Sequence, residues 1–456
     1  MKKKIWFAGI ILLLSGISYL LIYLNSLLPI ITGYPAKYLC SAVFISHRDA
    51  KSVEELDLNF SFIKYVKNDI NDAEKSVTSH FLWGKSKAIF REGLGAVLIR
   101  DTEENILKNS ELSTSYGNTA TQDTIPWPSG NLIGPGDKNH DGKLLKVVTE
   151  NLFNEKKYGG HPFGFLVIHD GNLVTEKYDK GLNERTRFLS WSMAKSLTNA
   201  LVGLMVMDGQ LTPDQPTGLK EWQGDDRKTI TIKNLLQMES GLDWNEDYGN
   251  RSDVTLMLYD HADFAGYALS KGLVEKPGKH WNYSSGTTNI VNLIMRRLFS
   301  TDSAYYAYAR ERLFNKTGMP DAIFETDASG TQAGSSYVYA TARDYGRFGL
   351  LYLNDGVFNG ERLLPEGWVK FTTTPSLNSE GQYGAFFWLN QGGRYPDAPR
   401  DMYSCNGHDG QQIFILPEKK LVVVVVGYSP HPEGNMDFNL LLKDVIGAIK
   451  EDEANN

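Results

Sequence analysis

The stretch Trp191-Ser192-Met193-Ala194-Lys195-Ser196 begins an apolar run that continues to Met207, which is long enough for one buried helix. A serine and a lysine three residues apart lie on one face of such a helix, one turn from each other. Unpaired N–H groups at the helix N-terminus favour a negative charge that develops beside the Ser192 hydroxyl. If the site is dry, Lys195 can take up the hydroxyl proton, so the pair predicts a serine nucleophile without a histidine base. By itself, however, the spacing is more typical of a helix cap followed by a solvated lysine.

Composition sets the class of protein. The chain has 456 residues, of which 41% are hydrophobic and 22% charged, as expected for one large or two ordinary globular domains. A net charge of −7 provides no basic surface, so we expect no nucleic-acid partner. Two cysteines, Cys40 and Cys405, are too few for a disulfide framework, although one pair between them stays open. No spacing of cysteine and histidine is typical of zinc, and we predict neither a metal nor a cofactor.

The N-terminus is typical of a membrane anchor. Lys2, Lys3 and Lys4 precede an uncharged segment, and its densest apolar part, residues 5–24, is long enough to cross a bilayer as one helix. We therefore predict a signal-anchor over residues 1–36, with the N-terminus cytoplasmic and the rest periplasmic or extracellular. The alternative is secretion after cleavage of a signal peptide, whose apolar region is normally shorter and ends in small residues.

Residues 37–136 are predicted to form an extension of their own. Residues 40–60 have an irregular pattern. Three alternating segments separated by glycines predict a small antiparallel meander, at residues 76–83, 85–90 and 96–100. Proline- and glycine-rich stretches at residues 126–128 and 134–136 then indicate a linker.

Residues 137–456 are predicted to form the main domain. Its start, Asp137 to Gly142, resembles half of a calcium loop, but the position of the bidentate carboxylate falls on Val148, so we interpret it as a turn and helix cap. Strands are predicted near both ends of the domain, with helices between them. The pattern therefore favours an α+β fold, in which one sheet joins distant parts of the chain and a helical region is inserted between its strands.

Two later stretches raise the significance of Ser192 and Lys195. In Trp281-Asn282-Tyr283-Ser284-Ser285-Gly286, a tyrosine just before a helix can project its hydroxyl into a cleft and shuttle protons near a lysine. The alternative is an amphipathic tyrosine at a domain edge. In Asn406-Gly407-His408-Asp409-Gly410-Gln411, glycines allow close approach of backbone to a ligand, and the next N–H can stabilise an oxyanion. Here the alternative is a tight hairpin with a turn histidine.

In this order, Ser192-x-x-Lys195, Tyr283-x-Ser285 and His408-x-Gly410 resemble the motifs of the serine β-lactamase and penicillin-binding-protein superfamily. The nearest branch is the class C-like serine hydrolases, which include esterases and 6-aminohexanoate-dimer hydrolases. The resemblance covers the chain from about residue 163 to its end. Residues 235–242 and 342–350 resemble the same branch.

This resemblance implies an antiparallel sheet flanked by helices beside an all-helical subdomain, with the active site in the cleft between them. It assigns Ser192 as the nucleophile, Lys195 as the activating base and Tyr283 as the proton relay to the leaving group. The implied oxyanion hole consists of the backbone N–H groups of Ser192 and Gln411. The implied substrate-binding residues are Ser285, His408, Gly410, Trp244 and Tyr248. The division of acid and base roles between Lys195 and Tyr283 stays open, because coupled groups share their titration.

Two positions depart from the β-lactamases that the chain resembles. Ser285 stands where many have asparagine, and His408 stands where many have lysine. A histidine is less suited than a lysine to a substrate carboxylate, so we expect hydrolysis of esters or linear amides. The aromatic residues Trp244 and Tyr248 are expected to cover the site and select the acyl group.

The sequence therefore predicts a membrane-anchored serine hydrolase that forms an acyl-enzyme with a small-molecule ester or amide. A sensor or penicillin-binding protein that is acylated without turnover is one alternative, and a β-lactamase or D-amino-peptidase is another. A non-catalytic scaffold is disfavoured, because all three side chains that the resemblance assigns to catalysis are retained. The natural substrate and the oligomeric state stay open.

Overall fold

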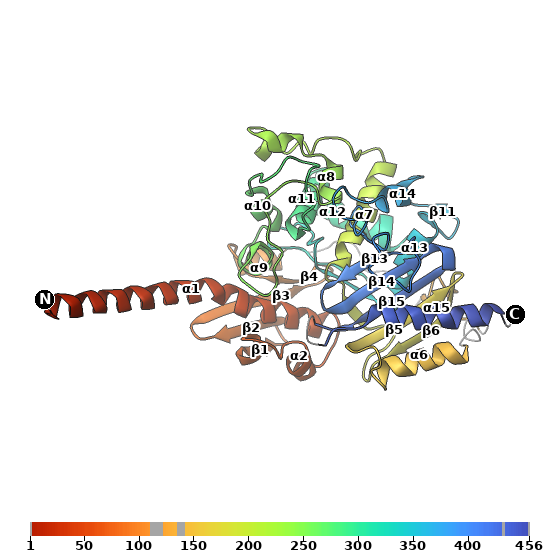
Figure 1. Ribbon diagram of the computed structural model, residues 1–456, viewed down its shortest axis with the longest axis horizontal. Coiled ribbons are helices and arrows are strands. Elements are labelled where there is room, and N and C mark those ends of the chain that lie inside the picture. The colour runs from red at the N-terminus through yellow and green to blue at the C-terminus, as the bar shows by residue number, and fades with distance from the viewer. Residues whose placement is uncertain (1, 110–121, 135–141, 431–433, 455–456) are drawn as a thin grey trace. The chain divides into compact units, whose positions relative to one another are not determined.

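The computed structural model describes residues 2–109, 122–134, 142–430 and 434–454 (Figure 1). It divides into two compact units. The first is built from residues within 1–91, 96–110 and 246–262, and the second from residues within 92–95, 111–245 and 263–456. The boundaries predicted at residues 36 and 136 stay predictions, and residues 137–141 of the calcium-loop-like stretch lie outside the described residues.

In the first unit, a long helix packs against a small sheet. Helix α1 (Lys2–Phe44) contacts the middle strands of a four-stranded sheet of order β1-β2-β3-β4. The strands are β1 (Lys67–Asn71), β2 (Ser76–Phe81), β3 (Gly84–Arg91) and β4 (Gly95–Leu98). Shorter helices complete the unit: α2 (Ala50–Leu56), η1 (Ile63–Tyr65), α3 (Glu104–Lys108) and α9 (Asp253–Asp260). The structure thus contains the predicted meander and adds β1 to it.

The irregular pattern predicted for residues 40–60 is wrong. Helix α1 continues to Phe44 through two prolines, Pro29 and Pro35. Burial stabilises the C-terminal part of α1, since Leu39 and Cys40 have no exposed surface. Helix α2 then begins at an N-cap, where Asp49 accepts a hydrogen bond from the Ser52 N–H at 2.8 Å.

Helix α1 has two halves of different environment. Except for the half-buried Ile10, its large apolar side chains are exposed from Ile5 to Tyr23, whereas Leu28 is buried. Thr32 Oγ1 lies 2.6 Å from Ser86 Oγ, so the second half is tied to β3. By length and composition α1 could cross a membrane, and a signal sequence near an N-terminus has the same character.

The second unit contains a six-stranded antiparallel sheet of order β12-β13-β14-β15-β5-β6. Its strands are β5 (His161–His169), β6 (Asn172–Tyr178), β12 (Trp388–Leu389), β13 (Tyr403–Gly407), β14 (Gln411–Leu416) and β15 (Leu421–Tyr428). Strand β15 pairs with β5, from Leu421 opposite His169 to Tyr428 opposite His161. The predicted sheet of strands from distant parts of the sequence is therefore present.

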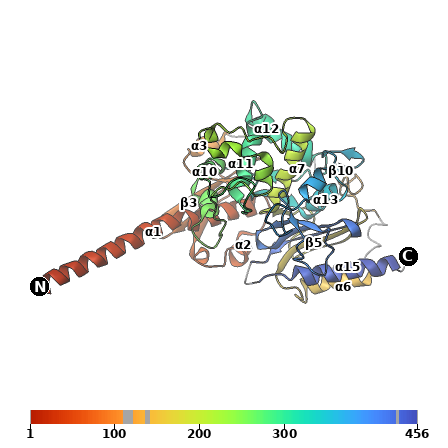
Figure 2. The ribbon, with the colours of Figure 1, turned by 45° about the horizontal axis from the view of Figure 1, so that its top comes forward.

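Helices cover both faces of this sheet (Figures 1 and 2). One face packs against α6 (Lys143–Phe153) and α15 (Phe438–Ala454) in an apolar core. The other face packs against α7 (Met193–Met207) and α13 (Ala342–Leu353). Gly349 lets α13 approach closely, because a Cβ there would lie 2.5 Å from Val422 Cγ1.

The rest of the second unit is mainly helical. Its helices are α8 (Ile232–Leu236), α10 (Phe264–Leu269), α11 (Ser285–Arg296), α12 (Asp302–Tyr308), α14 (Trp368–Thr372), the π-helical turn η4 (Ala309–Phe314), and the 3₁₀ turns η2 (Lys220–Trp222), η3 (Asp226–Thr229), η5 (His408–Gly410) and η6 (Pro417–Lys419). Short strands also occur: β7 (Arg187–Leu189), β8 (Ile323–Phe324) and β9 (Val338–Thr341) form a sheet of order β7-β9-β8, and β10 (Val357–Phe358) pairs with β11 (Glu361–Arg362).

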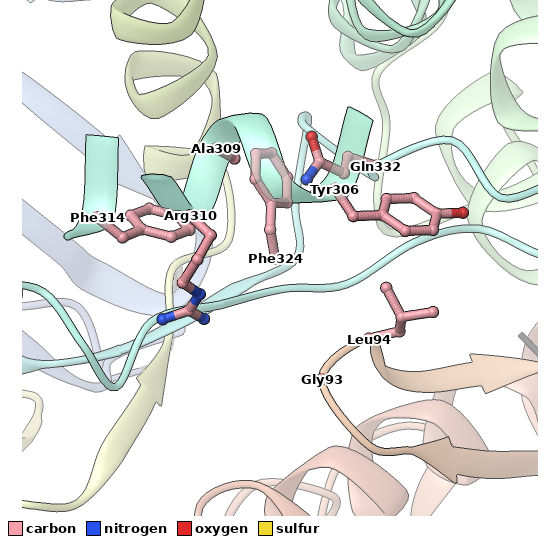
Figure 3. A pocket seen from close by; sticks show the side chains of 8 residues that line it. All are labelled: Gly93, Leu94, Tyr306, Ala309, Arg310, Phe314, Phe324 and Gln332. Carbon is pink, nitrogen blue, oxygen red and sulfur yellow. The ribbon is translucent and has the colours of Figure 1, made fainter. Parts of the chain in front are cut away.

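The turn between β3 and β4 belongs to the second unit. Gly93 and Leu94 line a small pocket with Tyr306 and Phe324 (Figure 3). Gly95 has a φ of +68°, and a Cβ there would lie 2.5 Å from Glu325 Cγ. Only glycine fits this turn without displacing its neighbour.

Candidate active site

Ser192 lies in a strained turn between β7 and α7. It is the N-cap residue of α7 and directly follows Trp191, which is buried and has a φ of +44°. A bulky residue rarely adopts a positive φ, and such strain persists only where the surroundings enforce it. Ser190 supplies part of that enforcement, because its N–H donates to Val338 O at 2.8 Å and its Oγ donates to Trp191 O at 2.9 Å.

Lys195 is the centre of a buried polar cluster. Its side chain is one helical turn after Ser192, and the residue is only 1% exposed. Its Nζ donates to Ser192 Oγ at 2.9 Å, to Ser285 Oγ at 3.0 Å and to the backbone oxygen of Ser335 at 3.0 Å. These oxygens replace water around the amine, as a buried nitrogen requires.

Tyr283 lies on the other side of this amine. Lys195 Nζ is 4.8 Å from the centre of the Tyr283 ring. Packing holds the ring in place, since its centre is 5.7 Å from that of Tyr383 and 5.4 Å from that of Trp388. Two residues later Ser285 begins α11, whose N-cap Ser284 accepts from the Thr287 N–H at 3.0 Å.

Trp244 packs against the start of α11. A Cβ on Gly286 would lie 2.4 Å from Trp244 Cζ3, so this helix position must be glycine for the indole to fit. Asn282 Nδ2 also donates to Trp244 O at 3.0 Å. Trp244 is therefore joined to the loop that carries Tyr283.

The β13–β14 hairpin closes against the Ser192 turn. A Cβ on Gly407 would lie 2.3 Å from Ser190 O, so glycine permits this approach. The His408 ring makes an edge contact with Trp191, with 5.3 Å between ring centres, and His408 Nε2 lies 3.3 Å from Asp409 Oδ1.

Gln411 and Gly410 occupy the end of the same hairpin. The Gln411 side chain is held by Gly427, because Nε2 donates to Gly427 O at 2.5 Å and Oε1 accepts from the Gly427 N–H at 3.1 Å. Gly410 has a φ of +85°, and a Cβ there would lie 2.9 Å from Ser429 Cβ. The backbone at the start of β14 is thus fixed on both sides.

The backbone also supplies a possible donor for an oxyanion. Among the described residues, no carbonyl accepts a hydrogen bond from the Ser192 N–H. This group lies at the N-terminus of α7, where the helix dipole favours negative charge. The nearby thiol of Cys405 has no comparable role, because burial raises its pKa to about 12 and keeps it protonated. Cys40 and Cys405 are both buried and form no disulfide.

The second unit brings together Ser192, Lys195, Tyr283, Ser285 and Trp244, with the hairpin of His408, Gly410 and Gln411 beside the Ser192 turn. Tyr248 belongs to the first unit, and its place at the site stays a prediction. The described residues contain no group of three or more metal-binding side chains.

Two members of the cluster had no signal in the sequence. The backbone oxygen of Ser335 contacts Lys195, and Asn289 in turn holds Ser335. Asn289 Nδ2 donates to Ser335 Oγ at 3.1 Å, and its Oδ1 accepts from the Ser335 N–H at 3.4 Å. Neither residue belongs to a spacing motif.

The chain is similar to known proteins over much of the second unit. A Beta-lactamase family model matches residues 156–446. A 6-aminohexanoate-dimer hydrolase from Paenarthrobacter ureafaciens is 26% identical over 59% of this chain and 73% of its own.

Solved structures share the fold. One is a putative 6-aminohexanoate-dimer hydrolase from Bacillus anthracis, with a TM-score of 0.56 and 20% identity over 68% of this chain and 82% of its own. Another is a family VIII carboxylesterase, with a TM-score of 0.54 and 13% identity over 71% of this chain and 99% of its own. These structures confirm the predicted fold class, and the family match confirms the predicted superfamily.

Proposed function

Because the chain belongs to the Beta-lactamase family, we propose that it is a serine hydrolase that cleaves ester or linear amide bonds through an acyl-enzyme on Ser192. One observation carries the proposal: Lys195 Nζ lies 2.9 Å from Ser192 Oγ at a helix N-terminus. This distance is within the range required for proton transfer between a nucleophile and its base.

In the acylation step, Lys195 acts as a neutral amine and accepts the proton of Ser192 Oγ. The oxygen then forms a bond with the substrate carbonyl carbon, and the carbonyl oxygen becomes an oxyanion. The backbone N–H groups of Ser192 and Gln411 stabilise this charge. Tyr283 donates its proton to the departing alcohol or amine as the scissile bond breaks, and Lys195 returns the proton to Tyr283.

Deacylation reverses these roles. A water molecule loses a proton to the Lys195–Tyr283 pair and attacks the ester carbon of the acyl-enzyme. Ser192 Oγ leaves and recovers a proton, and the acyl group departs as a carboxylic acid. Trp191 supports both steps, since its strained backbone holds Ser192 at the helix terminus.

The expected substrate class follows from the hairpin and the relatives. Histidine at position 408 is less suited than lysine to bind a carboxylate beside the scissile bond. The names of the similar proteins include a 6-aminohexanoate-dimer hydrolase and a family VIII carboxylesterase. We expect Trp244 to border the acyl group, with Ser285 and Gly410 beside it. Tyr248 joins this set only as a prediction from the sequence.

We further propose that α1 anchors the protein in a membrane. The apolar residues 5–24 are followed by a half of the helix that packs on β3, so the helix does not end at a small-residue cleavage site. The lysines before it favour a cytoplasmic N-terminus and place both compact units on the periplasmic or extracellular side.

The test is hydrolysis of p-nitrophenyl acetate and butyrate by the full chain in detergent micelles. The parent protein is expected to turn over, and Ser192→Ala is expected to lose at least about 10³-fold in kcat/KM. Equal rates in both proteins would refute Ser192 as the nucleophile. No turnover in either, together with a stable β-lactam adduct in the intact mass of the parent alone, would instead identify a protein that is acylated without turnover.

A further inference from the structure

The first unit exposes an unusual group of apolar side chains at one end of its sheet. The turn between β2 and β3 carries Leu82 and Trp83, which are 64% and 55% exposed. Phe62 and Tyr65 are 58% and 63% exposed, and the Phe62 ring contacts that of Phe81, the last residue of β2. We call these four residues, Phe62, Tyr65, Leu82 and Trp83, the aromatic collar. Large exposed apolar groups of this kind mark an interaction surface.

The collar lies at a defined level of α1. Trp83 Nε1 donates to Asn25 Oδ1 at 3.1 Å, and a Cβ on Gly84 would lie 2.8 Å from Leu28 Cβ. Asn25 is the first polar side chain after the exposed apolar stretch, and Leu28 is the first buried residue. The aromatic collar therefore lies beside the point at which the exposed apolar part of α1 ends.

The length of the exposed apolar part of α1 indicates that the partner of this surface is a lipid bilayer. Residues 5–24 form 20 helical residues, which at about 1.5 Å per residue span about 30 Å. This equals the thickness of the hydrocarbon core of a bilayer, about 30 Å. A membrane crossed by residues 5–24 thus has its surface at Asn25, the residue that binds Trp83. Figure 1 shows this half of α1 running away from β1, β2 and β3.

Charges at the same end of the sheet fit the surface of a membrane. Lys67 lies opposite His80, and His80 lies opposite Lys85, so the three side chains share one face of the sheet near the collar. Lys64 is exposed and lies over the Tyr65 ring at 5.2 Å. Tryptophan and tyrosine are enriched at headgroup level, and lysines there attract anionic lipids.

We infer that the aromatic collar inserts into the headgroup region of the bilayer that α1 crosses, giving the first unit a second attachment beside its helix. The inference rests on the proposed anchoring by α1. It differs from that proposal, because a helix anchor alone leaves the unit free to tilt and its sheet fully in water. Insertion of the collar fixes the β2–β3 turn at the lipid surface.

The experiment places a fluorescent thiol probe at single positions of the full chain in vesicles of phosphatidylcholine and phosphatidylglycerol. The native Cys40 and Cys405 are buried, and the unsubstituted chain serves as the labelling blank. Leu82→Cys reports on the collar. Ala73→Cys is its matched control, since it is exposed in the turn at the other end of β2, about 20 Å away. Ile11→Cys reports on the middle of the anchor.

Lipids that carry a nitroxide near the headgroup should quench the Leu82→Cys probe at least about twofold more than the Ala73→Cys probe. The Ile11→Cys probe should be quenched best by a nitroxide deep in the acyl chain. Equal quenching of the Leu82→Cys and Ala73→Cys probes, with the Ile11→Cys probe quenched, would refute insertion of the aromatic collar and would still support anchoring by α1. No quenching at Ile11→Cys would overturn both. A Leu82→Cys probe shielded from aqueous iodide but unquenched by lipid would indicate a protein partner instead.

Discussion

The interior of the second unit contains two buried regions of opposite character. The apolar layer lies between the sheet and helices α6 and α15, and its members include Phe165, Val423 and Leu441. The polar centre surrounds Lys195 and includes Ser285, Asn289 and Ser335, which are buried to the same degree. Apolar packing has no direction, whereas each hydrogen bond in the polar centre fixes one atom relative to another. The comparison indicates that one region supplies stability and the other supplies geometry.

The sharpest test of this division is Lys195→Ala. Loss of the amine leaves Ser192 without a base, so we expect kcat/KM to fall by about 10²- to 10⁴-fold. Stability should change far less than activity, because the variant also removes the need to satisfy a buried amine. Ester hydrolysis and urea unfolding measure the two effects on the same sample. Activity within about tenfold of the parent would assign the base to another group.

The reverse pattern is expected for the apolar layer. Leu441→Ala leaves a cavity beneath the sheet and should reduce the free energy of unfolding by about 2–5 kcal/mol, with kcat within about twofold of the parent. Leu440→Ala is the matched control, because Leu440 is only partly buried against the same layer. It should cost clearly less in urea unfolding. A loss of kcat in Leu441→Ala at temperatures where it is folded would show that the two regions are coupled.

The pH dependence of stability should also distinguish buried carboxyl groups of this unit from the apolar layer. Burial raises the pKa of Asp327 to about 6, although its carboxylate accepts from the Phe264 N–H at 2.9 Å and the Thr331 N–H at 3.0 Å. Burial likewise raises the pKa of Asp344 to about 6. Because both pKa values exceed the unfolded value of about 3.9, the folded state binds the protons more tightly.

Stability should therefore fall as pH rises from about 4 to about 6 and change no further from these groups above that range. The contribution of Asp327 is at most about 3 kcal/mol. Urea midpoints between pH 4 and pH 7 measure it, and Asp327→Asn should flatten the slope while lowering stability overall. Leu441→Ala, by contrast, should shift the whole curve without changing its slope. An unchanged slope in Asp327→Asn would rule out this carboxyl as a source.

These regions also differ in how far the sequence predicts them. The contact of Ser192 with Lys195 follows from helical spacing alone, since three residues make one turn. The contact of Lys195 with Ser285 joins residues 90 apart in the chain and was not predicted, because the resemblance to a family named Ser285 only as a substrate-binding residue. Helix α2 was not predicted, because its start depends on a single N-cap residue, Asp49, within an otherwise irregular pattern.

Ser335 and Asn289 could not be predicted at all. A backbone carbonyl has no sequence signature, and Asn289 acts on it through the fold rather than through a motif. Tyr248 stays a prediction: it belongs to the first compact unit, whereas Trp244, four residues earlier, belongs to the second.

Substitution of Asn289 therefore tests whether the polar centre positions Lys195, and it has the smallest expected effect on activity. It contacts neither Ser192 nor Lys195 in the hydrogen bonds described above, but it holds both the N–H and the hydroxyl of Ser335, whose carbonyl accepts from Lys195 Nζ. In Asn289→Ala that carbonyl loses its support, so the amine can shift relative to Ser192. We expect kcat to fall about tenfold with KM nearly unchanged, because the substrate contacts remain.

A matched control separates positioning from general stability. Asn199 is equally buried on α7, and its Oδ1 accepts from Tyr352 and Trp368 at 2.6 and 2.9 Å. Asn199→Ala should lower the urea midpoint at least as much as Asn289→Ala but keep kcat within about twofold. If both variants lower kcat in proportion to their loss of stability, Asn289 is only a structural residue. If Asn289→Ala alone lowers kcat and also shifts the pH profile of kcat, the polar centre positions the base through a residue that no motif contains.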